Sequence, residues 1–270
     1  MESETLLKIQ NLNTGFRIKD NYYNAVDDVT LDLCKNEVLA IVGESGCGKS
    51  TLATSIIGLH DPNITKVEGS ILFEGKNLVG LDEEQYNKIR GNKIGMIFQD
   101  PLSALNPLMK IGQQIEEGLL YHTKMSPTKL NEKERKERVL ELVERVGIPN
   151  PQRVINRFPH ELSGGMTQRV IIAIALSCKP DILIADEPTT ALDVTIQAQI
   201  LDLIKELEDE IGAGIILITH DLGVVAEMAD RVAVMYAGEI VELADVNELF
   251  KNPKHPYTRS LLSSIPQLDK

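Results

Sequence analysis

Short apolar runs alternate with amphipathic stretches along much of the chain. The segments VLAIVG (38–43), DILIADEP (181–188) and GIILITHD (214–221) each contain at least four consecutive apolar residues, which is typical of strands buried on both faces. Helical spacing of apolar residues follows in KSTLATSIIGL (49–59) and TIQAQILDLIKELEDEIG (195–212). Strands that alternate with helices in this way predict an α/β fold with a mainly parallel sheet covered by helices.

Other segments have the patterns of further strands and of antiparallel hairpins. A polar loop that contains the aromatic pair Tyr22 and Tyr23 is predicted between the segments 6–12 and 26–33. The segment 231–243 is predicted to be a hairpin that turns near Gly238. The predicted segments are LLKIQNL (6–12), VDDVTLDL (26–33), GSILFEGKNL (69–78), KIGMIFQD (93–100) and RVAVMYAGEIVEL (231–243).

A purely helical stretch interrupts the α/β pattern. From Leu102 to about Pro159 we find helical patterns and no good strand. The segment KLNEKERKERVLELVERVG (129–147) has an apolar stripe at helical spacing, and Glu134 and Arg138 are spaced for an i,i+4 ion pair. The charges of this segment indicate a solvated helix face without a function of their own. We therefore predict an all-helical insert within an α/β domain.

Composition narrows the class of protein. The 270 residues have a formal net charge of -12, which argues against a broad nucleic-acid-binding surface. Three widely spaced cysteines form neither a disulfide framework nor a CxxC metal pattern, so we expect a reducing cytoplasm. The N-terminus MESETLLKIQ does not resemble a signal peptide, and no apolar run approaches the ~20 residues of a membrane helix. We expect any membrane association to come through partners.

The segment GESGCGKS fits the phosphate-binding pattern G-x-x-x-x-G-K-[ST]. It follows a predicted strand and opens a predicted helix, which is the structural context that the motif requires. The glycines allow backbone N–H groups from about Ser45 to Ser50 to surround the phosphates of a nucleotide, Lys49 is predicted to reach the β- and γ-phosphates, and Ser50 to ligate Mg²⁺.

Polar residues at the ends of other predicted strands complete this site. Asp186 and Glu187 follow the apolar run ILIA and are predicted at the carboxyl edge of the sheet, where ligands bind in open α/β folds. Asp186 is predicted to hold Mg²⁺, and Glu187 to orient and polarise the attacking water. His220 is predicted at the same edge, where it contacts the γ-phosphate, and Gln99 is predicted to contact Mg²⁺ or the water.

A second glycine-rich turn stands before another predicted helix, in ELSGGMTQRV (161–170). A helix N-terminus of this kind also favours an anion, yet one nucleotide needs only one such loop. The loop lies at the far end of the helical insert. We therefore hypothesise that two chains associate head to tail and that the Ser163-Gly164-Gly165 loop of each contacts the γ-phosphate held by the other.

LSGGMTQR together with the other motifs resembles the nucleotide-binding subunit of an ABC transporter, over nearly the whole chain. The resemblance implies a P-loop NTPase fold with a RecA-like core, an antiparallel β subdomain and an inserted helical subdomain. It implies that 1–100 and 168–250 form the core with the β subdomain, that 101–167 form the helical subdomain, and that 251–270 form a tail, which its prolines place on the surface. By the family's motifs, Gly43–Thr51 is the Walker A loop, Gln99 the Q-loop, Leu162–Gln168 the signature, Ile182–Asp186 Walker B, Glu187 the catalytic glutamate, Ala191–Asp193 the D-loop and His220 the switch histidine.

These motifs, with the predicted chemistry, assign roles to residues. The resemblance also implies an aromatic ring against adenine, for which Tyr23 is the first candidate, Tyr22 the second and Phe16 a third. Predicted ATP-binding residues are Tyr23, Gly43, Ser45, Gly46, Cys47, Gly48, Lys49, Ser50 and Thr51. Predicted catalytic residues are Glu187, His220, Gln99 and Lys49; Mg²⁺ ligands are Ser50, Gln99 and Asp186; residues for the partner's ATP are Ser163, Gly164, Gly165 and Gln168; and Asp193 belongs to the D-loop.

Finer features resemble the dipeptide/oligopeptide importer branch, among them FQDPLSALNPLMKIGQQI, DEPTTALDVTIQAQIL and the tail HPYTRSLLSSIP. The resemblance implies a second ABC ATPase subunit, either identical or homologous, two membrane permeases, an extracytoplasmic substrate-binding protein, and a location at the cytoplasmic face of the membrane. Thr167 replaces an arginine that is common in this branch, a change expected to be mild. Many relatives continue into a cysteine-bearing extension that holds an iron–sulfur cluster. No cysteine of this chain lies there, so we predict no cluster.

Three alternatives stay open. The same branch also carries nickel and other small solutes, and the ATPase does not touch the cargo. A non-transport ABC ATPase is disfavoured by the short insert, the single set of motifs and the acidic composition. A regulatory ATPase that binds but hardly hydrolyses ATP is disfavoured because Glu187, His220 and the LSGG run are all present.

Overall fold

The computed structural model describes residues 4–123, 130–189, 192 and 194–263. These residues divide into two compact units, one formed by 1–86 with 212–270 and the other by 87–211. We call them unit 1 and unit 2 and describe each by itself.

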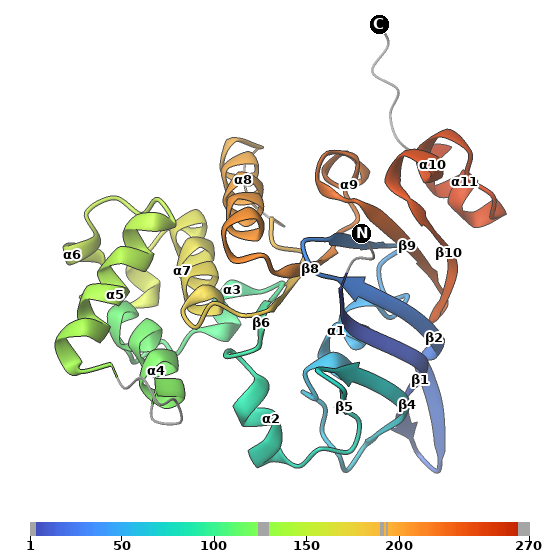
Figure 1. Ribbon diagram of the computed structural model, residues 1–270, viewed down its shortest axis with the longest axis horizontal. Helices are drawn as coiled ribbons and strands as arrows, with labels where there is room; N and C mark the ends of the chain where they lie inside the picture. The colour runs from blue at the N-terminus through green and yellow to red at the C-terminus, as the bar shows by residue number, and fades with distance from the viewer. Residues whose placement is uncertain (1–3, 124–129, 190–191, 193, 264–270) are drawn as a thin grey trace, which may run out of the picture. The chain divides into compact units, whose positions relative to one another are not determined.

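An antiparallel sheet of unit 1 has the strand order β2-β1-β4-β5. Its strands are β1 (Thr5–Ile18), β2 (Asn21–Cys34), β4 (Thr65–Phe73) and β5 (Lys76–Asn77). β1 and β2 form a long hairpin (Figure 1). The predicted loop around Tyr22 and Tyr23 is wrong, because both tyrosines lie in β2 and pair with Arg17 and Phe16 of β1. The turn is confined to 19–20, where Lys19 has a φ of +56°, and cross-strand pairing extends both strands toward it.

A second sheet begins in unit 1 with the strand order β10-β9-β3-β8. β3 pairs in parallel with both β8 and β9, and β10 pairs antiparallel with β9. The elements of this part are β3 (Val38–Val42), α1 (Lys49–Ile56), β8 (Gly214–Ile218), α9 (Leu222–Met228), β9 (Arg231–Tyr236), β10 (Glu239–Asp245), α10 (Val246–Lys251) and α11 (Pro256–Ser263). Every residue of β3 and β8 is buried, which explains their continuous apolar sequences.

The hairpin of β9 and β10 turns at Ala237 and Gly238, as predicted, and both residues have a positive φ. Such two-residue turns match the twist of the flanking strands. The tail is only partly a surface segment: α10 and α11 follow β10 (Figure 1), and Thr258 of α11 is fully buried.

Unit 2 combines two parallel strands with the helices of the predicted insert. β6 (Ile94–Ile97) and β7 (Ile182–Asp186) pair in parallel, with Ile97 opposite Ala185. α2 (Glu83–Ile89) crosses from unit 1 into unit 2. The other helices are α3 (Pro101–Ala104), α4 (Ile111–Thr123), α5 (Glu132–Arg145), α6 (Pro151–Val154), a 3-10 helix (Pro159–Glu161), α7 (Gly164–Leu176) and α8 (Val194–Ile211).

The apolar stripe predicted for α5 is buried, at Val139, Leu142, Val143 and Val146. The ion pair expected between Glu134 and Arg138 is wrong. Glu134 instead closes a capping box with Asn131 at the start of α5, and Arg138 pairs with Glu141 at 2.8 Å. An acid at the third helical position finds nearby backbone N–H groups, and these outcompete a side chain one turn away.

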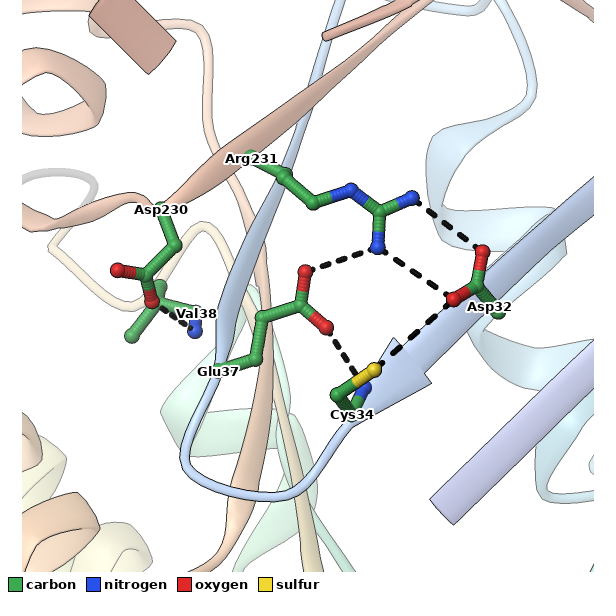
Figure 2. Close-up of polar contacts among 6 residues, drawn as sticks. All are labelled: Asp32, Cys34, Glu37, Val38, Asp230 and Arg231. Carbon is green, nitrogen blue, oxygen red and sulfur yellow. Dashed lines mark hydrogen bonds and ion pairs between the residues drawn. The ribbon is translucent and has the colours of Figure 1, made fainter. Parts of the chain in front are cut away.

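A charged cluster connects the two sheets of unit 1 through the start of β9 (Figure 2). The Arg231 guanidinium donates to Glu37 at 2.9 Å and to Asp32 at 3.3 Å. The Glu37 carboxylate, whose side chain is 9% exposed, also accepts the N–H of Cys34 at 2.6 Å. A nearly buried carboxylate therefore depends on one guanidinium for its charge partner.

We expect Arg231→Met to lower the free energy of unfolding by about 2 kcal/mol, because it keeps the aliphatic stem and leaves the Glu37 carboxylate buried without a cation. The matched control is Lys66→Gln, which breaks an exposed pair with Glu68 and should cost less than about 1 kcal/mol. Urea unfolding measures both variants. Equal losses in the two variants would show that Arg231 contributes no more than a surface charge.

Candidate functional site

The loop between β3 and α1 has the geometry of an anion-binding site. Gly48 caps α1 with a φ of +111° and provides no side-chain cap, so the first N–H groups of the helix are open to a ligand. A Cβ at Gly48 would lie 2.2 Å from the carbonyl oxygen of Ala25, so only glycine permits this approach of β2. Gly46 has a φ of +81°, which also favours glycine. Within the loop, Gly43 and Cys47 are buried, Thr51 is half-buried, and Ser45, Gly46 and Ser50 are exposed.

Lys49 folds back over this loop. Its ammonium donates to the carbonyl oxygens of Gly43 at 2.7 Å and Glu44 at 2.8 Å, and the residue is only 7% exposed. The positive charge therefore lies beside the uncapped start of α1, which favours a phosphate there.

His220 lies at the same edge of the sheet of unit 1. β8 ends at Ile218, which pairs in parallel with Ile41 of β3. The residues that follow these two strands therefore lie at the same edge of the sheet. His220 is exposed, and the following Asp221 caps α9 through the N–H groups of Gly223 and Val224. This cap turns the chain immediately after the histidine.

The three aromatic candidates for adenine differ in their surroundings. Tyr23 is 56% exposed and Tyr22 is 46% exposed, and they face opposite sides of β2 because they are adjacent in a strand. Phe16 pairs with Tyr23 across the hairpin, and its ring meets the edge of His60 with centroids 5.6 Å apart. Of the three, Tyr23 has the most exposed side chain for stacking.

In unit 2, Asp186 ends β7 and is 3% exposed. The next residue, Glu187, has a φ of +49°, a left-handed conformation that is uncommon for residues other than glycine. Strained backbone of this kind occurs often at functional sites. Gln99 lies two residues beyond β6, at the same sheet edge as Asp186 because β6 and β7 are parallel. Gln99 is exposed, and Asp100 caps α3 directly after it.

The second glycine-rich turn forms the start of α7. Ser163 is the N-cap, and its hydroxyl accepts the N–H of Met166 at 3.4 Å. A pocket of about 510 Å³ opens at this helix start, lined by Ser163, Gly164, Gly165, Met166, Arg169 and residues from α8 and the loops nearby. The predicted glycine-rich turn therefore borders a pocket that is also lined by the cationic side chain of Arg169.

Arg169 also lines this pocket, although it was not among the predicted site residues. Its guanidinium donates to the carbonyl oxygen of Val146 and to Gln199, both at 2.5 Å, and burial lowers its pKa. Arg169 lies four positions after Gly165 and therefore on the same helix face, a spacing that was available in the sequence.

The Gln168 side chain does not line the pocket at Ser163. It is 3% exposed and donates a hydrogen bond to the carbonyl oxygen of Pro188 at 2.6 Å. It thereby connects the first turns of α7 to the residue after Glu187. Asp193 of the predicted D-loop, with 190–191, lies outside the described residues.

The residues predicted to hold Mg²⁺ offer oxygen donors of the kind that Mg²⁺ prefers: the Asp186 carboxylate, the Ser50 hydroxyl and the Gln99 amide. Protein sites for Mg²⁺ commonly use one or two such groups together with phosphate oxygens. Within the described ranges, no group of three or more His, Cys, Asp or Glu side chains is arranged to hold a metal by itself. No helix in that part of the chain has the length and apolar character to span a membrane.

Comparison with protein families gives two matches. The ABC transporter family matches residues 26–190, and the family described as oligopeptide/dipeptide transporter, C-terminal region, matches residues 241–270. The oligopeptide transport ATP-binding protein OppD of Lactococcus lactis subsp. cremoris (strain SK11) is 60% identical over 269 residues, which cover 100% of this chain and 78% of the relative. The dipeptide transport ATP-binding protein DppD of Bacillus subtilis (strain 168) is 53% identical over 267 residues, covering 98% and 78%.

Solved structures show the same fold. The dimeric structure of MJ0796, a bacterial ABC transporter cassette, has a TM-score of 0.79 at 32% identity and covers 89% of this chain and 99% of that one. A second structure of MJ0796, a dimer in a post-hydrolysis state bound to ADP and Pi, has the same TM-score at 31% identity and the same two coverages. The predicted fold class is therefore confirmed: an α/β P-loop NTPase fold with a mainly parallel sheet.

Proposed function

Because the chain belongs to the ABC transporter family, we propose that it is the ATP-hydrolysing subunit of a membrane importer for oligopeptides or dipeptides. The observation that carries the proposal is the 60% identity over the full chain to an oligopeptide transport ATP-binding protein. The match of 241–270 to the C-terminal region of oligopeptide/dipeptide transporters supports the same cargo class.

The loop from Gly43 to Thr51 binds the phosphates of ATP in this proposal. The exposed residues Ser45, Gly46 and Ser50 and the uncapped start of α1 support this, and Lys49 exchanges its carbonyl partners for the β- and γ-phosphates. Tyr23 stacks on adenine, which its exposure on β2 supports.

Hydrolysis relies on charge placed around the γ-phosphate. Glu187 accepts a proton from the attacking water and orients it, while His220 and Lys49 stabilise the charge that develops on the phosphate. Gln99 contacts the water or the metal. Ser50, Gln99 and Asp186 would hold Mg²⁺, which neutralises phosphate charge when bound.

Two ATPase chains close head to tail over two nucleotides. Ser163, Gly164 and Gly165 contact the partner's γ-phosphate, and the pocket that they share with Arg169 supports an anion at this place. The buried Gln168 acts differently from Ser163: its hydrogen bond to Pro188 ties the signature helix to the backbone next to Glu187. Asp193 belongs to the segment between Glu187 and α8 and takes the D-loop role.

The remaining partners are a second ABC ATPase subunit, two membrane permeases and an extracytoplasmic substrate-binding protein, with this chain peripheral at the cytoplasmic face of the membrane. The segment that follows Gln99 belongs to the helical subdomain 101–167 and contacts the permease. Two leucines of this segment support a docking role, because Leu102 is 61% exposed and Leu108 is 86% exposed.

Uptake in cells tests the proposed function and its alternative cargo. In the source organism, replacing the gene with a Lys49→Ala copy should abolish uptake of a radiolabelled tripeptide and leave uptake of ⁶³Ni²⁺ unchanged. A Lys66→Gln copy, altered at an exposed lysine of β4, should transport normally. Loss of nickel uptake alone would assign the chain to the small-solute importers of the same branch. Normal uptake of both solutes would favour a non-transport ABC ATPase.

A further inference from the structure

The last described helix, α11, reaches back to the phosphate-binding loop. The Tyr257 hydroxyl accepts the backbone N–H of Glu44 at 3.1 Å, although the two residues are 213 positions apart. The Tyr257 ring packs on Tyr236 at the end of β9, with centroids 4.5 Å apart. A tail that the sequence placed on the surface therefore makes a directed hydrogen bond to the loop proposed to hold ATP.

The start of α11 is held firmly enough to position that hydroxyl. The Glu242 carboxylate on β10 accepts the N–H of Lys254 at 2.8 Å and of His255 at 2.9 Å. The His255 ring then accepts the N–H of Tyr257 at 3.1 Å, and Thr258 is fully buried. These contacts attach the first turn of α11 to the β9–β10 hairpin, so Tyr257 is not part of a loose chain end.

The peptide group between Gly43 and Glu44 is held by both side chains. Lys49 donates to its carbonyl oxygen, on Gly43, and Tyr257 accepts its N–H, on Glu44; Lys49 also donates to the carbonyl oxygen of Glu44 in the next peptide. A phosphate that attracts Lys49 competes for those donors, since an ammonium has only three. The Tyr257 contact does not compete, because the amides proposed to bind phosphate run from Ser45 to Ser50. Tyr257 can therefore hold the loop entry while Lys49 changes partners.

We propose that Tyr257 is a positioning residue for ATP binding, and that it fixes the Glu44 peptide so that the glycine-rich loop keeps its phosphate-binding shape. The inference rests on the proposed ATPase function. Loops with glycines at positive φ, such as Gly46 and Gly48, have much conformational freedom to lose on binding. A fixed entry reduces that loss and so strengthens nucleotide binding.

The test compares Tyr257→Phe with Tyr236→Phe in the full chain. Both variants keep the ring pair and remove one hydroxyl. Among the described residues the Tyr236 hydroxyl makes no hydrogen bond, so it serves as the control. We expect Tyr257→Phe to raise the KM for ATP about 3- to 10-fold, the range of one net hydrogen bond, with kcat within about two-fold of the unaltered chain. Tyr236→Phe should leave both constants unchanged.

Hydrogen–deuterium exchange of the peptide that contains 43–48 provides a readout that needs no nucleotide. Exchange there should accelerate in Tyr257→Phe and not in Tyr236→Phe, with equal melting temperatures. Glu242→Ala, which releases both N–H groups at the start of α11, should produce the same acceleration by another route.

Two results would overturn the inference. One is a Tyr257→Phe chain with unaltered KM and unaltered exchange. The other is a fall in kcat and melting temperature at constant KM, which would indicate a structural role only. If the unaltered chain neither binds nor hydrolyses ATP, the proposed function fails instead, and the exchange measurement still decides whether Tyr257 restrains the loop.

Discussion

Replacing Glu187 with glutamine should keep ATP binding and lower turnover at least about a hundred-fold, because a general base contributes about 10²- to 10⁴-fold to a rate. Glutamine matches glutamate in size but does not accept the proton of the attacking water. Glu187 follows the buried Asp186 and has a strained φ of +49°, which supports a functional role for this position. ATPase rates and titration with a fluorescent ATP analogue measure the two effects separately.

The same variant tests the head-to-tail pairing. If hydrolysis normally reopens the dimer, a chain that binds ATP without hydrolysing it should accumulate closed. Light scattering of Glu187→Gln should then show the mass double on addition of Mg-ATP. A second change, Ser163→Arg, places a long cationic side chain at the N-cap of α7 and should prevent the doubling.

Two other results would change these assignments. Turnover like that of the unaltered chain would remove Glu187 from the role of base. A monomeric mass despite bound ATP would mean that the chain closes only with a different ATPase subunit, and the proteins that co-purify with it would then identify that subunit.

Lys49→Ala should weaken ATP binding about 10- to 100-fold, the range for losing a hydrogen bond between charged groups. The side chain is 7% exposed, and its ammonium is already directed into the loop by the carbonyl oxygens of Gly43 and Glu44. A lysine held in this way already places its charge beside the loop, and it exchanges the two carbonyl oxygens for phosphate oxygens when ATP binds. Isothermal titration with Mg-ATP measures the affinity.

Thermal unfolding provides the control for Lys49→Ala. A ligand at 100 times its Kd stabilises the folded chain by about 2.7 kcal/mol, so ATP should raise the melting temperature of the unaltered chain and of Lys66→Gln. Lys49→Ala should show a much smaller rise at the same ATP concentration. An undiminished affinity would contradict the role of Lys49.

The strands that the sequence predicted most securely are those buried on both faces. All residues of β3, β7 and β8 are buried, and each strand contains a run of at least four apolar residues, which is visible without knowing its neighbours. The loop predicted around Tyr22 and Tyr23 is wrong for the opposite reason. These tyrosines are exposed, and their strand exists because β1 pairs with it, which no local pattern records.

In the candidate site, too, some features could be predicted from the sequence and others could not. Gly43 to Thr51 could be located by residue spacing alone, because a phosphate loop is a short, continuous segment between a strand and a helix. The direction in which the Gln168 side chain points could not be predicted from residue spacing. Its place in the signature motif groups it with Ser163, whereas its side chain is buried and bonded to the carbonyl oxygen of Pro188, 20 residues away. Arg169 lies on the face of α7 that borders the pocket, but its partners Val146 and Gln199 come from other segments.

The sequence by itself predicted the α/β fold class and located the phosphate-binding loop, because these depend on periodicity and spacing within short segments, and the resemblance of its motifs indicated the family. Only the tertiary structure decided which distant groups meet: the Tyr257 hydroxyl at the Glu44 amide, and Arg231 between Asp32 and Glu37. Such contacts depend on how the chain folds back across about 200 residues. A hydrogen bond requires its two atoms within about 3.5 Å, and a local sequence pattern carries no information on that distance.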